Sequence, residues 1–204
     1  MQHKILLLLP LFLLGCSENT GSIDNYLVSR NLTDASRTDM IVHCHGYGCK
    51  LKSEVSLSNA DWNQIARNFN KKPSTPKAER AAIKNALGTF EQIVGAKTGT
   101  DQDRKGTFKR LGHDQHDCVD ESINASVYMR AMIEKGLIKF HFVGTPETRL
   151  PLFHTGTWPH QAATIYEIDS KKKYVVDTWW EDNGRPAHIV PFDDWKTGWR
   201  ADEV

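Results

Sequence analysis

The sequence predicts an α+β domain in which helices come first and an antiparallel sheet follows. Apolar residues recur at helical spacing from about residue 59 to residue 137. After residue 137 the period changes to the alternation that is typical of strands, interrupted by turn residues. A chain of 204 residues has room for one domain with a proper core.

The first residues have the layout of a secretory signal, with Lys4 before an apolar run at 5–14 and Cys16 after it. As a helix this run reaches about 15 Å, roughly half of the hydrocarbon thickness of a bilayer, so it is too short to span a membrane. The string LLGC resembles the lipobox of bacterial lipoproteins, which implies that residues 1–15 are removed and that Cys16 carries lipid. Ser17 resembles the pattern of lipoproteins sent to the outer membrane. An ordinary signal peptide cleaved nearby is the alternative.

Polar residues dominate the next segment, with Ser, Asn, Thr and Asp most frequent up to about residue 38. This composition predicts a flexible tether over residues 16–38, between the lipid and a folded domain at 39–204.

Three helices are expected in the first part of the domain. The first covers residues 59–69. The second starts after Thr75, an N-cap residue followed by proline, and is expected to stop at Gly95. A surface loop rich in Gly, Asp and Thr is expected at 98–112, and the third helix at 118–135.

Strands are expected in the last third of the chain. Ile138, Phe140 and Phe142 alternate with polar residues. Two β-rich runs follow at 161–168 and 173–180, around a turn, and a short strand is expected at His188 to Val190. Together these elements predict N-terminal helices packed on an antiparallel sheet.

The four cysteines can be sorted by position. Cys44 and Cys49 lie on either side of a glycine-containing turn, and in an exported protein this arrangement favours a disulfide. The alternative is a metal site formed by these cysteines with His43 and His45, but the spacing matches no standard zinc ligand set. With Cys16 assigned to lipid, Cys118 is left unpaired, and a leftover cysteine in a secreted chain suggests a chemical role.

Cys118 is predicted to be a nucleophile, because it stands at the start of a helix. The free backbone N–H groups and the positive end of the dipole stabilise a thiolate there, and the same N–H groups can stabilise an oxyanion. A thiolate nucleophile needs a base and a group that orients the base. His160 heads one predicted strand and Asp177 interrupts the next. A buried aspartate among apolar neighbours requires a polar partner, and His160 is the natural candidate.

Three local strings carry a resemblance to a known family: DCVDES around Cys118, WPHQAATI around His160 and VVDTWW around Asp177. Their order resembles the transglutaminase-like branch of the papain-like cysteine enzymes, which includes bacterial transglutaminase-like cysteine proteinases of the periplasm. The resemblance covers roughly the third of the chain between Cys118 and Trp180. It implies a papain-like or transglutaminase-like fold and a cysteine peptidase or amidase with a Cys–His–Asp triad.

One geometric condition follows for the pair His160 and Asp177. A turn centred between Ser170 and Lys171 would place Asp177 opposite Thr164, about 13 Å from His160 along the strand. We therefore expect either a turn centred nearer Asp169 or a β-bulge.

Further roles are assigned to residues near the nucleophile. Gln115 is a candidate side-chain donor to the oxyanion, as a glutamine upstream of the cysteine is in papain relatives, and an ordinary loop glutamine is the alternative. No cofactor or metal is expected. Calcium at Asp117, Asp120 and Glu121 is an alternative that the resemblance suggests, although acidic residues are common at helix N-termini without a metal.

The charge distribution gives no electrostatic footprint for a nucleic-acid partner, because 26 basic and 25 acidic residues are spread without a long run of either sign.

The expected partners are a protein or peptide substrate in the cell envelope and the membrane. The membrane is reached through the lipid on Cys16, which places the protein on the periplasmic face of a bacterial membrane. The expected reaction is acyl transfer on amide bonds with water as acceptor. A cross-linker or protein glutaminase is one alternative, and a non-catalytic lipoprotein module that binds a peptide, glycan or envelope protein is another. A metal enzyme built on the Cys44 and Cys49 cluster is a third and weaker alternative. No oligomeric state is predicted.

Overall fold

The computed structural model describes residues 22–107, 111–150 and 159–201, and it confirms the α+β class. Strands β1 (Met40–His45) and β2 (Leu51–Ser56) form an antiparallel hairpin. A second sheet has four antiparallel strands in the order β3–β4–β5–β6. Their bounds are β3 (His141–Arg149), β4 (His160–Glu167), β5 (Lys173–Asp177) and β6 (His188–Pro191). The predicted signal peptide at 1–15 and Cys16 lie outside the described residues.

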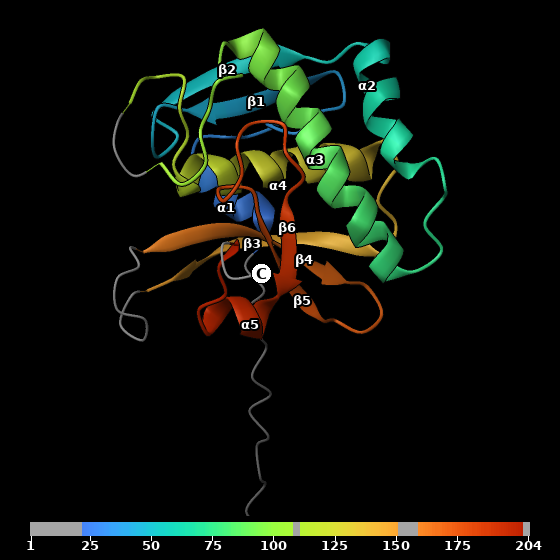
Figure 1. Cartoon of the computed structure of the whole chain (residues 1–204). Coiled ribbons are helices and arrows are strands. Elements are labelled where there is room, and N and C mark those ends of the chain that lie inside the picture. The colour runs from blue at the N-terminus through green and yellow to red at the C-terminus, as the bar shows by residue number, and fades with distance from the viewer. Residues whose placement is uncertain (1–21, 108–110, 151–158, 202–204) are drawn as a thin grey trace, which may run out of the picture.

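Helix α4 (Cys118–Glu134) is the central element. It lies between the β1–β2 hairpin and the four-stranded sheet, and it contacts β1 on one side and β3 and β4 on the other (Figure 1). Because both sides are covered, its residues from Asp120 to Met129 are buried without interruption. Every polar side chain on this stretch must therefore find a partner inside the protein.

Helices α2 (Asn59–Ala66) and α3 (Pro76–Thr98) pack together beside this layered core. A short 3-10 helix, η1 (Arg67–Phe69), continues α2, so the expected span of 59–69 is confirmed. Thr75 caps α3 by accepting a bond from the Ala78 N–H at 3.2 Å, as its sequence predicts.

The expected stop of α3 at Gly95 is wrong. The helix continues to Thr98 and ends at Gly99, which adopts the left-handed conformation with φ of 74°. Gly95 is needed for packing instead, because a Cβ there would lie 3.0 Å from the Cα of Asp101 and 3.1 Å from the side chain of Asn183.

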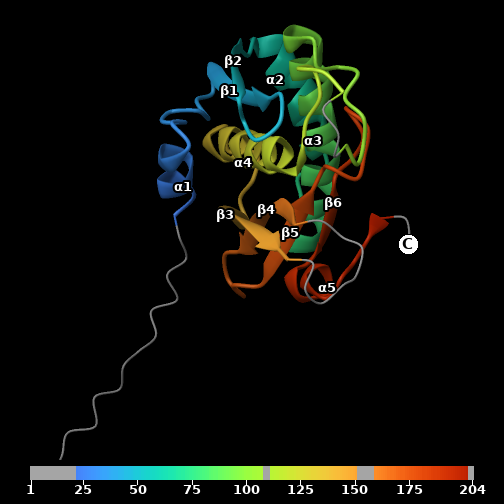
Figure 2. The same cartoon turned by 90° about the vertical axis from the view of Figure 1, so that its left-hand side faces the viewer.

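The segment that was expected to be a flexible tether is folded where the structure describes it. Residues Ile23–Ser29 form helix α1, with Ser22 as its N-cap. Ile23 and Leu27 are buried in the main hydrophobic core, and α1 lies beside α4 and β3 (Figure 2). Two apolar residues about one helical turn apart thus face the core, and Asp24 of the same helix forms an ion pair with Arg130 of α4.

Besides α1, a β-hairpin and a short helix were not expected from the sequence. The β1–β2 hairpin was missed because its loop is irregular: Gly46, Tyr47, Gly48 and Cys49 all have positive φ, which matches no common two-residue turn. The short helix α5 (Phe192–Lys196) was also missed, and it brings the buried Trp195 under the sheet.

The predicted disulfide between Cys44 and Cys49 is confirmed, with the two Cα atoms 4.6 Å apart. It closes the tip of the β1–β2 hairpin. Both sulfurs are used in this bond, so the alternative metal site with His43 and His45 is not formed.

Among the described residues, no helix is both long enough and apolar enough to cross a membrane.

The contact between α3 and the 184–187 loop gives a test of the packing. Gly88→Ala places a methyl group where an ideal Cβ lies 2.8 Å from the carbonyl oxygen of Arg185. Because of this overlap, we expect the substitution to lower the free energy of unfolding by roughly 1–3 kcal/mol. At an exposed helix position, Ala would instead stabilise the helix by about 1 kcal/mol relative to Gly. Urea denaturation measures the change. The control Asn85→Ala, at an exposed position of the same helix, should be neutral or stabilising, and equal effects at the two positions would contradict the predicted contact.

Candidate active site

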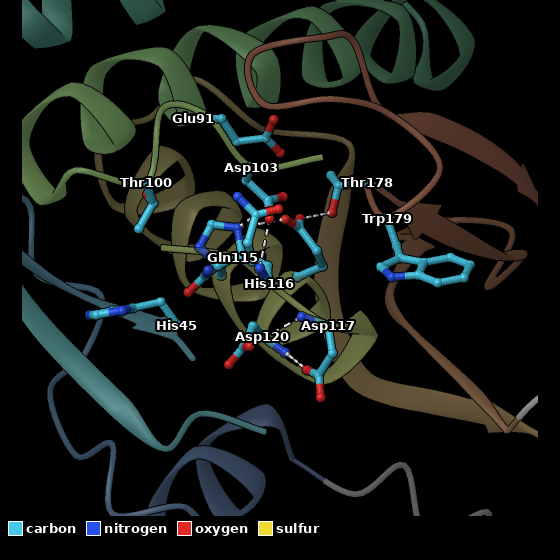
Figure 3. A network of polar contacts seen from close by, with 12 residues as sticks. His45, Glu91, Thr100, Asp103, Gln115, His116, Asp117, Asp120, Thr178 and Trp179 are labelled. Carbon is cyan, nitrogen blue, oxygen red and sulfur yellow. Dashed lines mark hydrogen bonds and ion pairs between the residues drawn. The ribbon is translucent and has the colours of Figure 1, made fainter. Parts of the chain in front are cut away.

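Cys118 is the first residue of α4, as the sequence predicts, and its thiol is free and half-buried. Asp117 is the N-cap: its side chain accepts bonds from the N–H groups of Val119 at 3.0 Å and of Asp120 at 2.9 Å. The Asp120 carboxylate in turn accepts from the Asp117 N–H at 3.2 Å, which completes a capping box (Figure 3).

This capping box decides which N–H groups remain for an oxyanion. The amides of Val119 and Asp120 are occupied by Asp117, and the amide of Glu121 bonds the carbonyl of Asp117 at 3.0 Å. No described residue accepts a bond from the N–H of Cys118 itself. Of the donors expected at this helix start, the backbone of the nucleophile is therefore the one that is available.

Asp120 also fixes the helix start to the disulfide loop. Its two oxygens accept from the N–H of Cys49 at 2.6 Å and the N–H of Tyr47 at 2.8 Å. Burial and the neighbouring Asp117 raise the pKa of Asp120 to about 7, although the backbone bonds oppose this shift. Near neutral pH, this carboxyl group holds the hairpin tip against the first turn of α4.

His160 and Asp177 are in contact. The Nε2 of His160 and the Oδ2 of Asp177 are 2.7 Å apart, and the two residues are 3% and 1% exposed. The register of β4 and β5 explains the contact: Ala163 pairs with Val176, so the strands continue with Asp177 opposite Ala162, one diagonal step from His160. The turn is centred between Asp169 and Ser170, which confirms the expectation of a turn nearer Asp169.

Two indole groups also bond the Asp177 carboxylate, at Oδ2, whereas its buried Oδ1 has no hydrogen-bond partner among the described residues. Its Oδ2 also accepts from the Nε1 of Trp195 at 3.0 Å and the Nε1 of Trp180 at 3.2 Å. The ring of Trp179 lies 4.8 Å from that of His160. Three N–H donors thus converge on one oxygen, and aromatic rings exclude water from the pair.

The electrostatics favour the charged form of both groups. Burial by itself lowers the pKa of His160, but the charge and hydrogen bond of Asp177 and the nearby Cys118 thiol raise it to about 9. Burial by itself raises the pKa of Asp177, but His160, Trp195 and Arg149 together hold it below its usual value. At neutral pH the pair is therefore an imidazolium and a carboxylate.

The second ring nitrogen of His160, Nδ1, is buried and has no hydrogen-bond partner among the described residues. Nε2 is engaged by Asp177, and the thiol of Cys118 is close enough to affect the pKa of the ring. Nδ1 is therefore the ring nitrogen that no described residue occupies.

Gln115 is buried and bonded to the preceding loop. Its Nε2 donates to the carbonyl of Gln102 at 2.9 Å and its Oε1 accepts from the N–H of Arg104 at 3.1 Å. These bonds account for its place in the loop, and an oxyanion role for it stays a prediction.

The structure does not bring Asp117, Asp120 and Glu121 together around one point. Asp117 and Asp120 point at backbone N–H groups, whereas Glu121 accepts a bond from the hydroxyl of Thr178. In the described residues, the His, Cys and acidic side chains that are close enough to share an ion are Asp103, His116 and Glu121. The sequence did not predict this cluster, because its members come from a loop and from both sides of the nucleophile.

Other residues of the site were also missed. Trp195 and Arg149 lie near Asp177, and the Arg149 guanidinium donates to the carbonyl of Trp195 at 2.7 Å. Gln161, next to His160, donates to the hydroxyl of Tyr26 at 2.9 Å, which ties α1 to the site. Arg149 and Tyr26 lack a local signal, since they are brought to the site by strand pairing and by the docking of α1.

The His160–Asp177 pair predicts a loss of stability at alkaline pH. The pKa of His160 is about 9 in the folded protein, against an ordinary value of about 6.5 in the unfolded chain. The pair therefore adds about 3 kcal/mol to the free energy of unfolding below about pH 6.5, and this stabilisation is lost as the pH rises through 9. We expect urea denaturation at pH 6 and pH 9.5 to show this loss in the parent and not in His160→Gln. Equal pH dependence in the two proteins would contradict the prediction.

Comparisons with known proteins identify no relative of this chain: no family model, no curated protein and no solved structure matches it. The relation to transglutaminase-like enzymes accordingly stays a prediction from its three motifs.

Proposed function

We propose that this protein is a cysteine peptidase or amidase of the transglutaminase-like, papain-like type. The observation that carries the proposal is the buried contact of 2.7 Å between His160 and Asp177, with the free thiol of Cys118 beside the same imidazole. Buried ion pairs are costly unless they are well bonded, and in this one two indole N–H groups also donate to Oδ2 of Asp177, whereas its Oδ1 has no partner among the described residues. A nucleophile, a proton carrier and an orienting acid are thus present together.

The proposed reaction begins with the thiolate of Cys118 and the imidazolium of His160. The sulfur attacks the carbonyl carbon of an amide, a C–S bond forms, and the carbonyl π electrons move to the oxygen, which the N–H of Cys118 stabilises. The C–N bond then breaks as His160 gives its proton to the leaving amine. A thioester and a neutral imidazole remain.

Water completes the cycle. Neutral His160 takes a proton from a water molecule while the oxygen of that water attacks the thioester carbon. The C–S bond then breaks, which releases a carboxylic acid and the thiolate of Cys118. The imidazolium is restored in the same step. Asp177 holds the ring in one orientation and stabilises its charge throughout, without accepting the proton itself.

A cavity near Asp177 is the candidate place for substrate. A cavity of about 320 Å³ opens next to Trp180 and is also lined by Lys105, Gly106, Glu181 and Ala201. Trp180 itself donates to Asp177 at 3.2 Å, so this cavity adjoins the orienting acid. A peptide or other amide in this cavity can contact the Trp180 ring and one side chain of each charge, Lys105 and Glu181.

We also propose that the enzyme is held at the periplasmic face of a membrane, in the outer membrane of a bacterium, through lipid on Cys16. The support is the LLGC string of the sequence alone. Replacing Cys16 with Ala should release the protein from washed membranes, and retention of the variant would contradict the anchor.

The thiol chemistry predicts selective alkylation. At pH 6 we expect iodoacetamide to modify Cys118 faster than an ordinary thiol, whose pKa is about 8.5, because the imidazolium of His160 stabilises the thiolate. His160→Ala should slow the reaction at least about tenfold. Peptide mass spectrometry over time measures the rates, with His188→Ala as the control at a histidine that pairs instead with Glu181. Slow modification of Cys118 that does not depend on His160 would contradict the thiolate mechanism.

The reaction itself is tested on labelled casein with an added fluorescent amine. Release of peptides supports a peptidase, incorporation of the amine supports a cross-linker, and release of ammonia supports a glutaminase. We expect peptides, and a loss of roughly 10²–10⁴-fold in Cys118→Ala and in Asp177→Asn. A reactive thiol without any of the three products would favour the binding-module alternative.

A further inference from the structure

A second buried polar cluster lies behind the nucleophile. It is formed by Asp103 of the loop after α3, His116 just before α4, and Glu121 in the first turn of α4. Figure 3 labels Asp103 and His116 of this cluster. One ligand atom from each residue lies within 4.8 Å of the others, and all three residues are buried. This cluster has no part in the thiol mechanism.

The centre of the cluster is an imidazole nitrogen without a hydrogen-bond partner. His116 is 3% exposed, and its Nδ1 lies 3.2 Å from the Oδ2 of Asp103 and 3.1 Å from the Oε1 of Glu121. Neither contact has the geometry of a hydrogen bond, so Nδ1 is left unsatisfied inside the protein. Two buried carboxylate oxygens around this nitrogen require a positive charge at that point, which either a proton on Nδ1 or a bound metal ion supplies.

The remaining polar atoms of these residues are held by partners. The Oδ1 of Asp103 accepts from the N–H of His116 at 2.6 Å, and the Oε2 of Glu121 accepts from the hydroxyl of Thr178. The Nε2 of His116 lies 3.1 Å from the Nε2 of His43, whose Nδ1 in turn lies 2.8 Å from the hydroxyl of Tyr128. Such outer partners fix the orientation of each ligand, and they are typical of metal sites.

We propose that Asp103, His116 and Glu121 bind one divalent transition-metal ion of the zinc class, through Oδ2, Nδ1 and Oε1. An imidazole nitrogen with two carboxylates suits zinc, whereas calcium takes oxygen ligands. For an ion about 2.1 Å from the nitrogen and from either oxygen, the separations of 3.2 and 3.1 Å correspond to nitrogen–ion–oxygen angles of roughly 95–100°. Its two positive charges balance the two buried carboxylates.

The ion would join the loop before the nucleophile to the first turn of its helix. His116 is two residues before Cys118 and Glu121 is three residues after it. The bond between Glu121 and Thr178 extends this connection to the residue next to Asp177. The role is structural positioning, and it is independent of the reaction proposed above.

The test uses Cys118→Ala protein, so that the thiol cannot bind metal. Because the cluster is buried, the protein is unfolded in chelator, refolded and then titrated with zinc chloride, with bound metal measured by elemental analysis and affinity by calorimetry. We expect one zinc per chain and a melting temperature that rises with zinc. His116→Gln in the same background should weaken zinc binding at least about 100-fold. The matched control His188→Gln should bind as its parent does.

Two further measurements distinguish this site from zinc bound elsewhere on the chain. Asp103→Asn and Glu121→Gln keep the shape of each side chain and should lower the affinity in the same way, whereas Asp101→Asn in the same loop should not. The absorption spectrum of bound Co²⁺ should be the same with and without Cys118. The inference is overturned if the refolded protein binds no zinc, if His116→Gln binds it equally well, or if the cobalt spectrum requires Cys118.

Discussion

The anchored first turn of α4 is the constraint on which the rest of the site depends. Asp117 caps the helix, and Asp120 reaches from the same turn to the backbone of the disulfide loop. Farther along, Asn124 accepts from the N–H of Cys44 at 2.7 Å and donates to its carbonyl at 2.8 Å. Side chains of the helix that carries Cys118 therefore hydrogen-bond to backbone groups of the hairpin, as the backbone of a neighbouring strand would.

This arrangement gives the short disulfide a specific role. A six-residue loop contributes only about 2 kcal/mol through chain entropy, but the same loop presents two N–H groups to Asp120. Because Asp120 is buried and its pKa is raised to about 7, the bonds to Cys49 and Tyr47 compensate a carboxylate that would otherwise be costly. The loop thus orients the nucleophile helix as well as closing the hairpin.

His160 and Asp177, the proposed base and orienting acid, come from the opposite side of α4, from the four-stranded sheet. The contact between His160 and Asp177 depends on where the turn after β4 is centred. A shift of this centre by one residue changes the partner of each strand residue by two positions, and such a shift would separate His160 from Asp177. Thr178 then ties the end of β5 to Glu121 of α4. The two halves of the proposed triad are linked by this bond as well as by packing.

By itself the sequence determined helices α2, α3 and α4, the strands of the last third and the disulfide, and it singled out the three residues of the proposed triad, because helix caps, strand alternation and cysteine spacing are local signals. Only the tertiary structure decided the register that joins His160 to Asp177, the docking of α1 and the cluster around His116. These depend on contacts between residues far apart in the chain: 73 positions separate His116 from His43. No local sequence pattern predicts such a contact, because it forms only when a loop and a hairpin pack on the same buried helix.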